Sequence, residues 1–191
     1  MSFLSWDHPM TTASIDMVLS SGTGSASFGV LRGFNRPGML LEILFVLETT
    51  GEQSIYVDRF LPNTPLRIVV DHTGKDVTDS YSVETFDKKV TAGSIDPLLD
   101  NERVVETLLP DMISAAKSIA AAHRKEEIAM GMLRMNLTLN HEIERLFVLQ
   151  QKNKNIRPEE IQIAVGEQGT LATLIQHAQL RMDAIQLILC Q

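Results

Sequence analysis

Arg59-Phe60-Leu61-Pro62-Asn63-Thr64-Pro65 runs directly into Leu66-Arg67-Ile68-Val69-Val70-Asp71, which places a rigid bend before a strongly apolar run. Each proline fixes φ and removes a backbone donor, so strand pairing has to stop at Pro62 and Pro65. The apolar residues on both sides therefore predict a strand, a corner and a second strand. Short turns of this kind favour antiparallel neighbours, because parallel strands need longer crossovers.

Apolar runs on either side of this corner predict further strands. The expected strands are residues 26–32, 39–48, 54–61, 66–71 and 77–86, with turns at 36–38 and 50–52. The run 39–47 is apolar on both faces except for Glu42, so it predicts an interior strand. Before them, Asp7, Pro9 and a helical spacing of apolar residues predict a helix that ends near residue 20.

The second half of the chain has a helical texture. Residues 98–109 predict a short helix that stops before Pro110, and 110–151 predict one long helix. Its apolar stripe consists of Met112, Ala116, Ile119, Met130, Leu133 and Leu137, continued by Ile143, Leu146 and Phe147. Pro158 with two following glutamates predicts the start of a second helix, expected to run to about residue 189. Two such helices should pack as an antiparallel hairpin.

These patterns predict an α+β fold: an antiparallel or mixed sheet of about five strands, followed by a long antiparallel helical hairpin. Residues 1–96 would form a strand-rich lobe and residues 97–191 a helical lobe, within one structural unit. At 1.5 Å per residue the first long helix would reach roughly 60 Å, more than a compact domain of this size needs. We therefore expect the hairpin to project, or to pack on something outside the chain.

Composition limits the functional classes. The formal net charge is −7 and the pI about 5.2, which argues against a domain that grips nucleic acid by itself. The only cysteine, Cys190, permits no intrachain disulfide and fits a reducing cytosol. The longest apolar run, 39–47, is too short to cross a bilayer, and the start of the chain does not resemble a secretory signal. We expect a soluble, cytoplasmic protein without a membrane partner.

No stretch of the sequence carries a complete catalytic or metal-binding motif. Gly22-Thr23-Gly24 follows a predicted helix, whereas a phosphate loop follows a strand, and Gly74-Lys75 is followed by Asp76 where a magnesium-binding hydroxyl is needed. In His141-Glu142-Ile143-Glu144-Arg145 an arginine stands where a second zinc ligand would be. We therefore expect no catalytic, cofactor-binding or metal-binding residue in this chain.

Basic residues gather near the predicted hairpin tip. Arg145, Lys152, Lys154 and Arg157 are candidates for contact with an acidic partner or a phosphate backbone, and a solvated tip is the competing interpretation. Met130, Met132 and Met135 also lie close together, as core filler or as an adaptable binding surface.

Six short segments, in this order, resemble one family over essentially the whole chain. They are Trp6-Asp7-His8-Pro9, Gly22-Thr23-Gly24-Ser25, the corner Arg59-Phe60-Leu61-Pro62-x-Thr64-Pro65, Glu84-Thr85-Phe86, Asn155-Ile156-Arg157 and Arg181-x-Asp183-Ala184. Together they resemble the C-terminal region of the RapA (HepA) family, bacterial RNA polymerase-associated ATPases of the SWI/SNF type. Each segment alone is weak, but their joint order is specific.

The resemblance implies a fragment that begins just after the ATPase core of a larger protein. ATP and Mg²⁺ would bind in that core, so no catalytic residue transfers to this chain. The implied partners are core RNA polymerase, the ATPase lobes of the parent chain, and DNA or RNA through the parent.

Three functional hypotheses remain open on the sequence. The favoured one is a non-catalytic accessory domain of a polymerase-recycling factor, which serves as a docking or intramolecular packing surface. The alternatives are a nucleic-acid-contacting module that uses the basic tip, and a small-molecule enzyme with an unrecognised site in the sheet.

Overall fold

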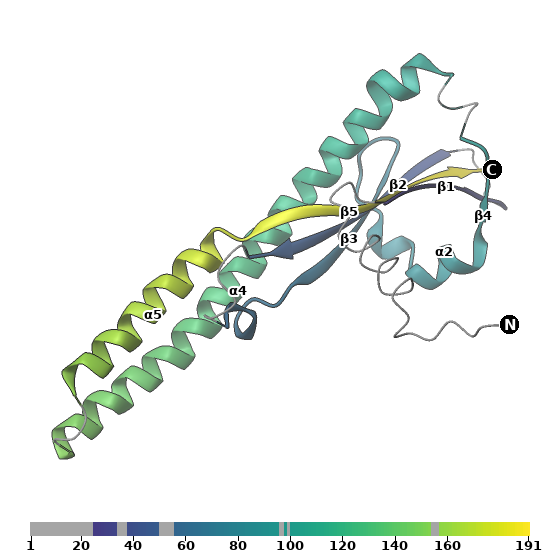
Figure 1. The fold of residues 1–191 in the computed structure, drawn as a ribbon. Coiled ribbons are helices and arrows are strands. Elements are labelled where there is room, and N and C mark those ends of the chain that lie inside the picture. The colour runs from purple at the N-terminus through teal and green to yellow at the C-terminus, as the bar shows by residue number, and fades with distance from the viewer. Residues whose placement is uncertain (1–24, 34–37, 50–55, 96–97, 99, 154–156) are drawn as a thin grey trace, which may run out of the picture.

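The computed structural model describes residues 25–33, 38–49, 56–95, 98, 100–153 and 157–191 (Figure 1). The strands are β1 (Ser25–Leu31), β2 (Gly38–Glu48), β3 (Thr64–Asp71), β4 (Val90–Ala92) and β5 (Gln179–Cys190). The helices are α2 (Val83–Lys89), α4 (Leu109–Lys152) and α5 (Pro158–Gln176), with the short 3-10 turns η2 (Val57–Arg59) and η3 (Thr78–Ser80) and the π-helical turn η4 (Val104–Leu108).

The five strands form one mixed sheet in the order β3-β2-β5-β1-β4. The last strand, β5, lies in the middle: it runs antiparallel to β2 and parallel to β1, so that Leu187 faces both Leu41 and Phe28. The other pairs, β2 with β3 and β1 with β4, are antiparallel. The α+β class and the five-stranded mixed sheet are confirmed.

The expected extent of the second long helix is wrong. That helix, α5, ends at Gln176, and residues 179–190 form the central strand β5. Both faces of the second half of this strand are covered, and a strand covered on both faces gives a continuous apolar run that periodicity cannot distinguish from a buried helix. The alternation of polar and apolar residues in Gln179-Leu180-Arg181-Met182-Asp183 is the strand signal that the sequence analysis missed.

Two expected strands are also wrong. The described part of 54–61 forms the 3-10 turn η2, which follows Tyr56 at a φ of 43°. In place of a strand over 77–86, η3 leads into helix α2, because the side chain of Ser82 caps the helix and accepts a hydrogen bond from the Thr85 backbone at 3.3 Å. The helix expected before residue 20 and the 22–24 loop lie outside the described residues.

Pro110 does not stop a helix, contrary to expectation. It is the second residue of α4 and follows helical residues without a break. The turn before it is the wider π-helical turn η4. The chain therefore continues from Glu102 through Pro110 into the long helix.

The sheet is covered on both faces. The first turns of α4 lie on one face, where Met112, Ala116 and Ala120 are fully buried with Leu41 and Ile43 of β2. Short α2 covers part of the other face through Phe86. The division at residue 96 stays a prediction, and β5 from the second part pairs with strands of the first.

The proline corner joins the sheet to the helical hairpin. Phe60 and Leu61 are 4% and 1% exposed and pack in one cluster with Met135 of α4 and Ile175 of α5. Gly131 of α4 leaves room for this contact, because a Cβ there would lie 3.3 Å from the Phe60 carbonyl oxygen. The predicted bend leads into β3 as expected, but it follows the turn η2 and not a strand, and its apolar side chains pack at the base of the hairpin.

Candidate docking surface on the helical hairpin

The α4–α5 pair extends beyond the sheet as a projecting arm (Figure 1). Helix α4 has 44 residues, which correspond to about 66 Å at 1.5 Å per residue. Its buried contacts with the sheet, made by Met112, Ala116 and Ala120, all lie near its start. Beyond the corner, α4 packs chiefly against α5. The hairpin predicted from sequence is confirmed, with α5 shorter than expected.

A narrow seam holds the two helices of the arm together. On α5 the buried residues Ile161, Leu171 and Ile175 face α4. The Gln168 side-chain amide donates to Asn136 Oδ1 at 3.2 Å and to Asn140 Oδ1 at 2.9 Å, which adds a polar layer. A seam of this kind covers one face of each helix and leaves the other faces to solvent.

The arm exposes a row of large apolar side chains on α4. Met130, Leu133 and Leu137 are 50%, 51% and 65% exposed. Met130 follows Met112, and Leu137 follows Ile119, by 18 residues, or about five turns at 3.6 residues per turn. The stripe predicted from sequence is therefore continuous along the helix, but the sheet covers only its first half. The sequence pattern predicted one uniform stripe and did not indicate that only its first half would be covered by the sheet.

The basic candidates predicted at the tip lie on both helices. Arg145 and Lys152 are exposed on α4, seven residues apart and so on the same side of the helix. Arg157 precedes α5, and its backbone N–H donates to the Glu160 carboxylate at 3.4 Å. Lys154 lies outside the described residues.

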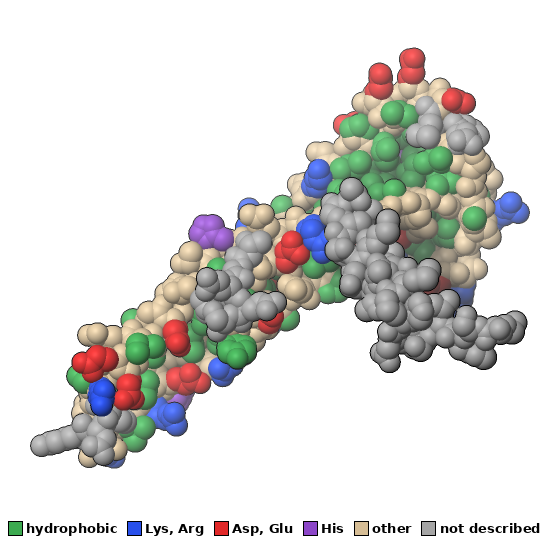
Figure 2. Space-filling view, in the orientation of Figure 1, with side chains coloured by type: hydrophobic (Ala, Val, Ile, Leu, Met, Phe, Trp, Pro, Cys, Tyr) green, Lys and Arg blue, Asp and Glu red, His purple; other side chains and the backbone are tan. Residues whose placement is uncertain are grey.

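The arm is neutral overall. Residues 124–168 contain seven lysines and arginines and seven glutamates, so the excess acidic charge of the chain lies elsewhere. Blue and red side chains are interspersed near the end of the arm (Figure 2). Arg59 pairs with Glu142 at 3.6 Å, whereas Arg134, Arg145 and Lys152 form no ion pair among the described residues. Arg134 is exposed on α4 but lies outside the basic cluster predicted at the tip.

The arginines of the corner region have structural roles. Arg67 is paired with Glu42, donates to the Tyr81 carbonyl oxygen at 2.6 Å and lies 5.1 Å above the Phe86 ring. Arg59 stacks on Phe60 at 5.3 Å besides pairing with Glu142. Each of the two arginines forms an ion pair with a glutamate of another element.

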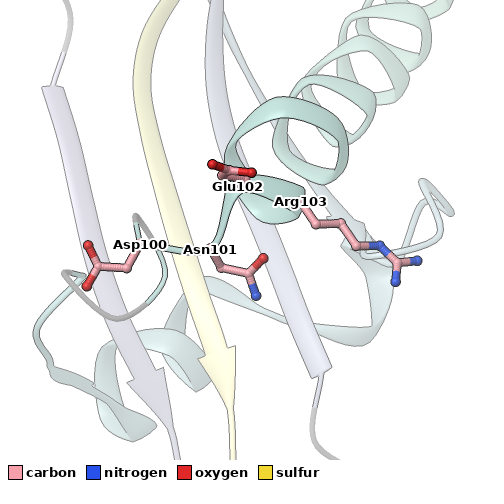
Figure 3. Close-up of a pocket in the computed structure, with 4 residues that line it drawn as sticks. All are labelled: Asp100, Asn101, Glu102 and Arg103. Carbon is pink, nitrogen blue, oxygen red and sulfur yellow. The ribbon is translucent and has the colours of Figure 1, made fainter.

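One hollow of the described surface lacks a convergent catalytic set. Near the start of α4, Asp100, Asn101, Glu102 and Arg103 line a shallow pocket, and their exposed side chains point in different directions (Figure 3). Within the described ranges no group of three histidine, cysteine or carboxylate side chains is placed to hold a metal ion. Across the same ranges, the helices also lack an apolar segment long enough to span a bilayer.

Comparison with known proteins identifies relatives over the whole chain. The family model described as "RNA polymerase recycling family C-terminal" matches residues 1–190. The "RNA polymerase-associated protein RapA" of Proteus mirabilis is 29% identical over 188 residues, which are 97% of this chain and 19% of that protein. The RapA protein of Vibrio cholerae serotype O1 is 30% identical over 192 residues, with 98% of this chain and 20% of the relative covered.

The chain thus spans about a fifth of the length of the curated relatives that it matches. The resemblance seen in the short sequence segments is confirmed. The chain belongs to the RNA polymerase recycling family and corresponds to the C-terminal region of its members.

Proposed function

We propose that this chain is a non-catalytic accessory module that docks onto RNA polymerase through its projecting arm. The observation that carries the proposal is the arm itself, which exposes Met130, Leu133 and Leu137 away from the folded core. Exposed apolar side chains that cluster on one face of a protein often mark a site where another protein binds. The partner comes from the printed name of the relatives, RNA polymerase-associated protein.

In this proposal the chemistry belongs to the remaining length of the parent protein. ATP and Mg²⁺ would be bound there, by an ATP-dependent, helicase-like translocase of the SWI/SNF type that recycles polymerase in the bacterial cytoplasm and contacts DNA or RNA. The C-terminal module would then hold this motor against the polymerase, or pack on its ATPase lobes.

A shortened arm tests the proposal. Because Gln168 lies 2.9 Å from Asn140, a short glycine-containing loop can replace residues 141–167 and close the hairpin without removing β5. The intact 191-residue chain should bind immobilised core RNA polymerase. A shortened chain that also carries Met130→Gln/Leu133→Gln/Leu137→Gln, so that the exposed apolar side chains are removed together with the tip, should bind at least about tenfold more weakly while still unfolding in one cooperative thermal transition. Equal binding of both chains would exclude the arm as the docking element.

Nucleic-acid contact is the second candidate function. It is favoured by Arg145 and Lys152, which have no ion-pair partner among the described residues. If these two residues, Lys154 and Arg157 all contacted phosphates, the logarithm of the binding constant for duplex DNA would fall with the logarithm of the salt concentration, with a slope of about −3.6. Replacement of all four by alanine should then abolish the salt dependence. A salt-independent affinity would contradict this function.

A further inference from the structure

We propose that a basic hollow at the end of the sheet opposite to the arm binds a phosphate group. The hollow has a volume of about 300 Å³, and among the described residues that line it are Arg32, Gly33, Ser80, Thr85 and Lys89. Strand β5 begins beside the arm and runs to this end of the sheet, where its last residue pairs with the last residue of β1 (Figure 1). The site is therefore separate from the arm and goes beyond the proposed function.

The sheet brings the two bases of the hollow close together. Leu31 of β1 pairs with Val90 of β4, and this is the last pair of their ladder. Arg32 follows that pair on one side and Lys89, the last residue of α2, precedes it on the other. Like charges on neighbouring strands repel each other, so an anion between the two bases would relieve this repulsion.

The charge of the hollow is positive. The described residues that line it include no aspartate or glutamate, and neither Arg32 nor Lys89 forms an ion pair among the described residues. The backbone of Gln191 pairs with Leu31 and Gly33, so its α-carboxylate lies nearby, but it too forms no ion pair with either base. Across the described lining, two bases face at most this one carboxylate.

Three acidic residues are next to lining residues in the sequence but do not line the hollow themselves: Asp79, Glu84 and Asp87. Around α2, Glu84 and Asp87 are turned about 140° and 200° away from Lys89. Glu84 instead precedes Lys88 by four residues, which is the spacing of an ion pair within a helix. These acids therefore leave the charge of Lys89 to the hollow.

Hydroxyl groups add neutral donors beside the bases. Ser80 ends η3, and Thr85 lies one turn before Lys89 on the same side of α2. Thr85 Oγ1 lies 2.9 Å from Ser82 Oγ, and where Ser82 donates this hydrogen bond the Thr85 hydroxyl is left to donate to a ligand. At Gly33 no described atom lies within 4 Å of the place that a Cβ would take, so the hollow stays open there. Arginine, lysine and hydroxyl groups together are donors that phosphate oxygens accept.

The size of the hollow limits the ligand. A volume of about 300 Å³ lies at the lower end of the range for ligand sites, and it suits a phosphate or diphosphate with a small attached group. The recognised chemistry is the phosphate group itself, which either a free nucleotide or a nucleic-acid backbone can supply.

Titration of the full chain with inorganic pyrophosphate tests the proposal. Calorimetry should show saturable binding, and Arg32→Gln/Lys89→Gln should weaken it at least about tenfold, because both charge-assisted contacts are lost. Lys88→Gln/Arg103→Gln is the matched control, since it removes the same charge from exposed positions outside the described lining. The control should bind as the original chain does. Equal weakening by the two double variants would overturn the proposal, because it would show a general charge effect and no site.

Two further probes distinguish the sources of the phosphate group. Adenosine diphosphate and a short single-stranded DNA without terminal phosphates are each tested for competition with pyrophosphate. Competition by the diphosphate alone assigns the site to a free nucleotide, and competition by the DNA assigns it to a nucleic-acid backbone; both results support a phosphate site. Failure of all three probes to bind at concentrations up to about 10 mM would overturn the proposal.

Amide chemical shifts locate the site without any substitution. Saturating pyrophosphate should shift the resonances of Gly33, Thr85 and Lys89 and leave that of Leu137 on the arm unchanged. Shifts confined to the arm would overturn the proposal. Because the hollow and the arm lie at opposite ends of the sheet, Arg32→Gln/Lys89→Gln should bind core RNA polymerase as the original chain does, so the two proposals can fail separately.

Discussion

The two halves of α4 belong to one helix but are stabilised differently. Towards its start, Met112 is 1% exposed against the sheet, whereas Met130 on the same side of the helix is 50% exposed. The first half is held by a broad apolar interface and the second mainly by a narrow seam with α5. One amphipathic pattern can therefore cover the core of its own domain along the first half of a helix and remain exposed, as a candidate protein-binding surface, along the second half.

Thiol reactivity should show the largest difference between the two halves. Cys190 in the sheet is 2% exposed, and burial raises the pKa of its thiol, so it should react only when the sheet opens. In the variant Leu137→Cys, the new thiol on the arm should react at least about 100-fold faster with a maleimide or disulfide reagent. Loss of the slow reaction phase in the variant Cys190→Ala would assign that phase to the Cys190 thiol. Similar rates for both thiols would show that the sheet is no more closed than the arm.

Two methionine truncations should differ strongly in stability. Met112→Ala removes a buried side chain and should lower the free energy of unfolding by about 2–5 kcal/mol. Met130→Ala, five turns further along the same face, should change it by less than about 0.5 kcal/mol. Urea denaturation measures both. A large loss of unfolding free energy in Met130→Ala would mean that the exposed stripe of Met130, Leu133 and Leu137 is part of the folded core.

Much of this division could be predicted from the sequence. The strands β1, β2 and β3 lie within two residues of their predicted bounds, because their apolar runs are flanked by turn residues or by the prolines of the corner. Strand β5 was missed because its end, Leu187-Ile188-Leu189-Cys190, is apolar on both faces, and its pairing with β1 and β2 makes this end a strand. Tertiary contacts, not local pattern, decide such a segment.

The candidate site was predicted only in part. Arg145 and Lys152 were identified as exposed bases, and both are exposed on α4. Periodicity reveals that a helix has an apolar face, but it cannot reveal where the sheet that covers this face ends. For that reason Met130, Leu133 and Leu137 were grouped with Met112 as one stripe.

Two glycine substitutions test how tightly each region is packed. Gly166→Ala on α5 meets no atom within 4 Å, so it should stabilise the protein by about 0.5–1 kcal/mol through helix propensity. Gly131→Ala should gain almost nothing, because its Cβ would lie 3.3 Å from the Phe60 carbonyl oxygen at the base of the arm. Thermal unfolding of the two variants measures the difference. Equal stabilisation would contradict a tight joint at the corner.

The smallest expected effect is the acid sensitivity contributed by Asp71 in the sheet half. Burial acts to raise the pKa of Asp71, but hydrogen bonds from the Thr73 side chain and from the backbone N–H groups of Lys75 and Thr73 leave it below its ordinary value. A lowered pKa in the folded state stabilises the protein above the unfolded pKa, and this stabilisation is lost as the pH falls through the folded value. Asp71→Asn should flatten the loss of stability below about pH 4 by a few tenths of a kcal/mol. If the free energy of unfolding of the original chain and of Asp71→Asn fell in parallel as the pH was lowered, Asp71 would contribute nothing to the acid sensitivity.

Methionine footprinting with and without core RNA polymerase tests the central claim most directly. Met112 and Met135 are 1% and 0% exposed, so hydroxyl radicals should oxidise them slowly in both states. Met130 should be oxidised rapidly in the free chain and be protected severalfold by saturating polymerase. Protection of Met130 with unchanged Met112 and Met135 is the result that docking through the exposed residues Met130, Leu133 and Leu137 of the arm predicts. Undiminished oxidation of Met130 in the complex would contradict it.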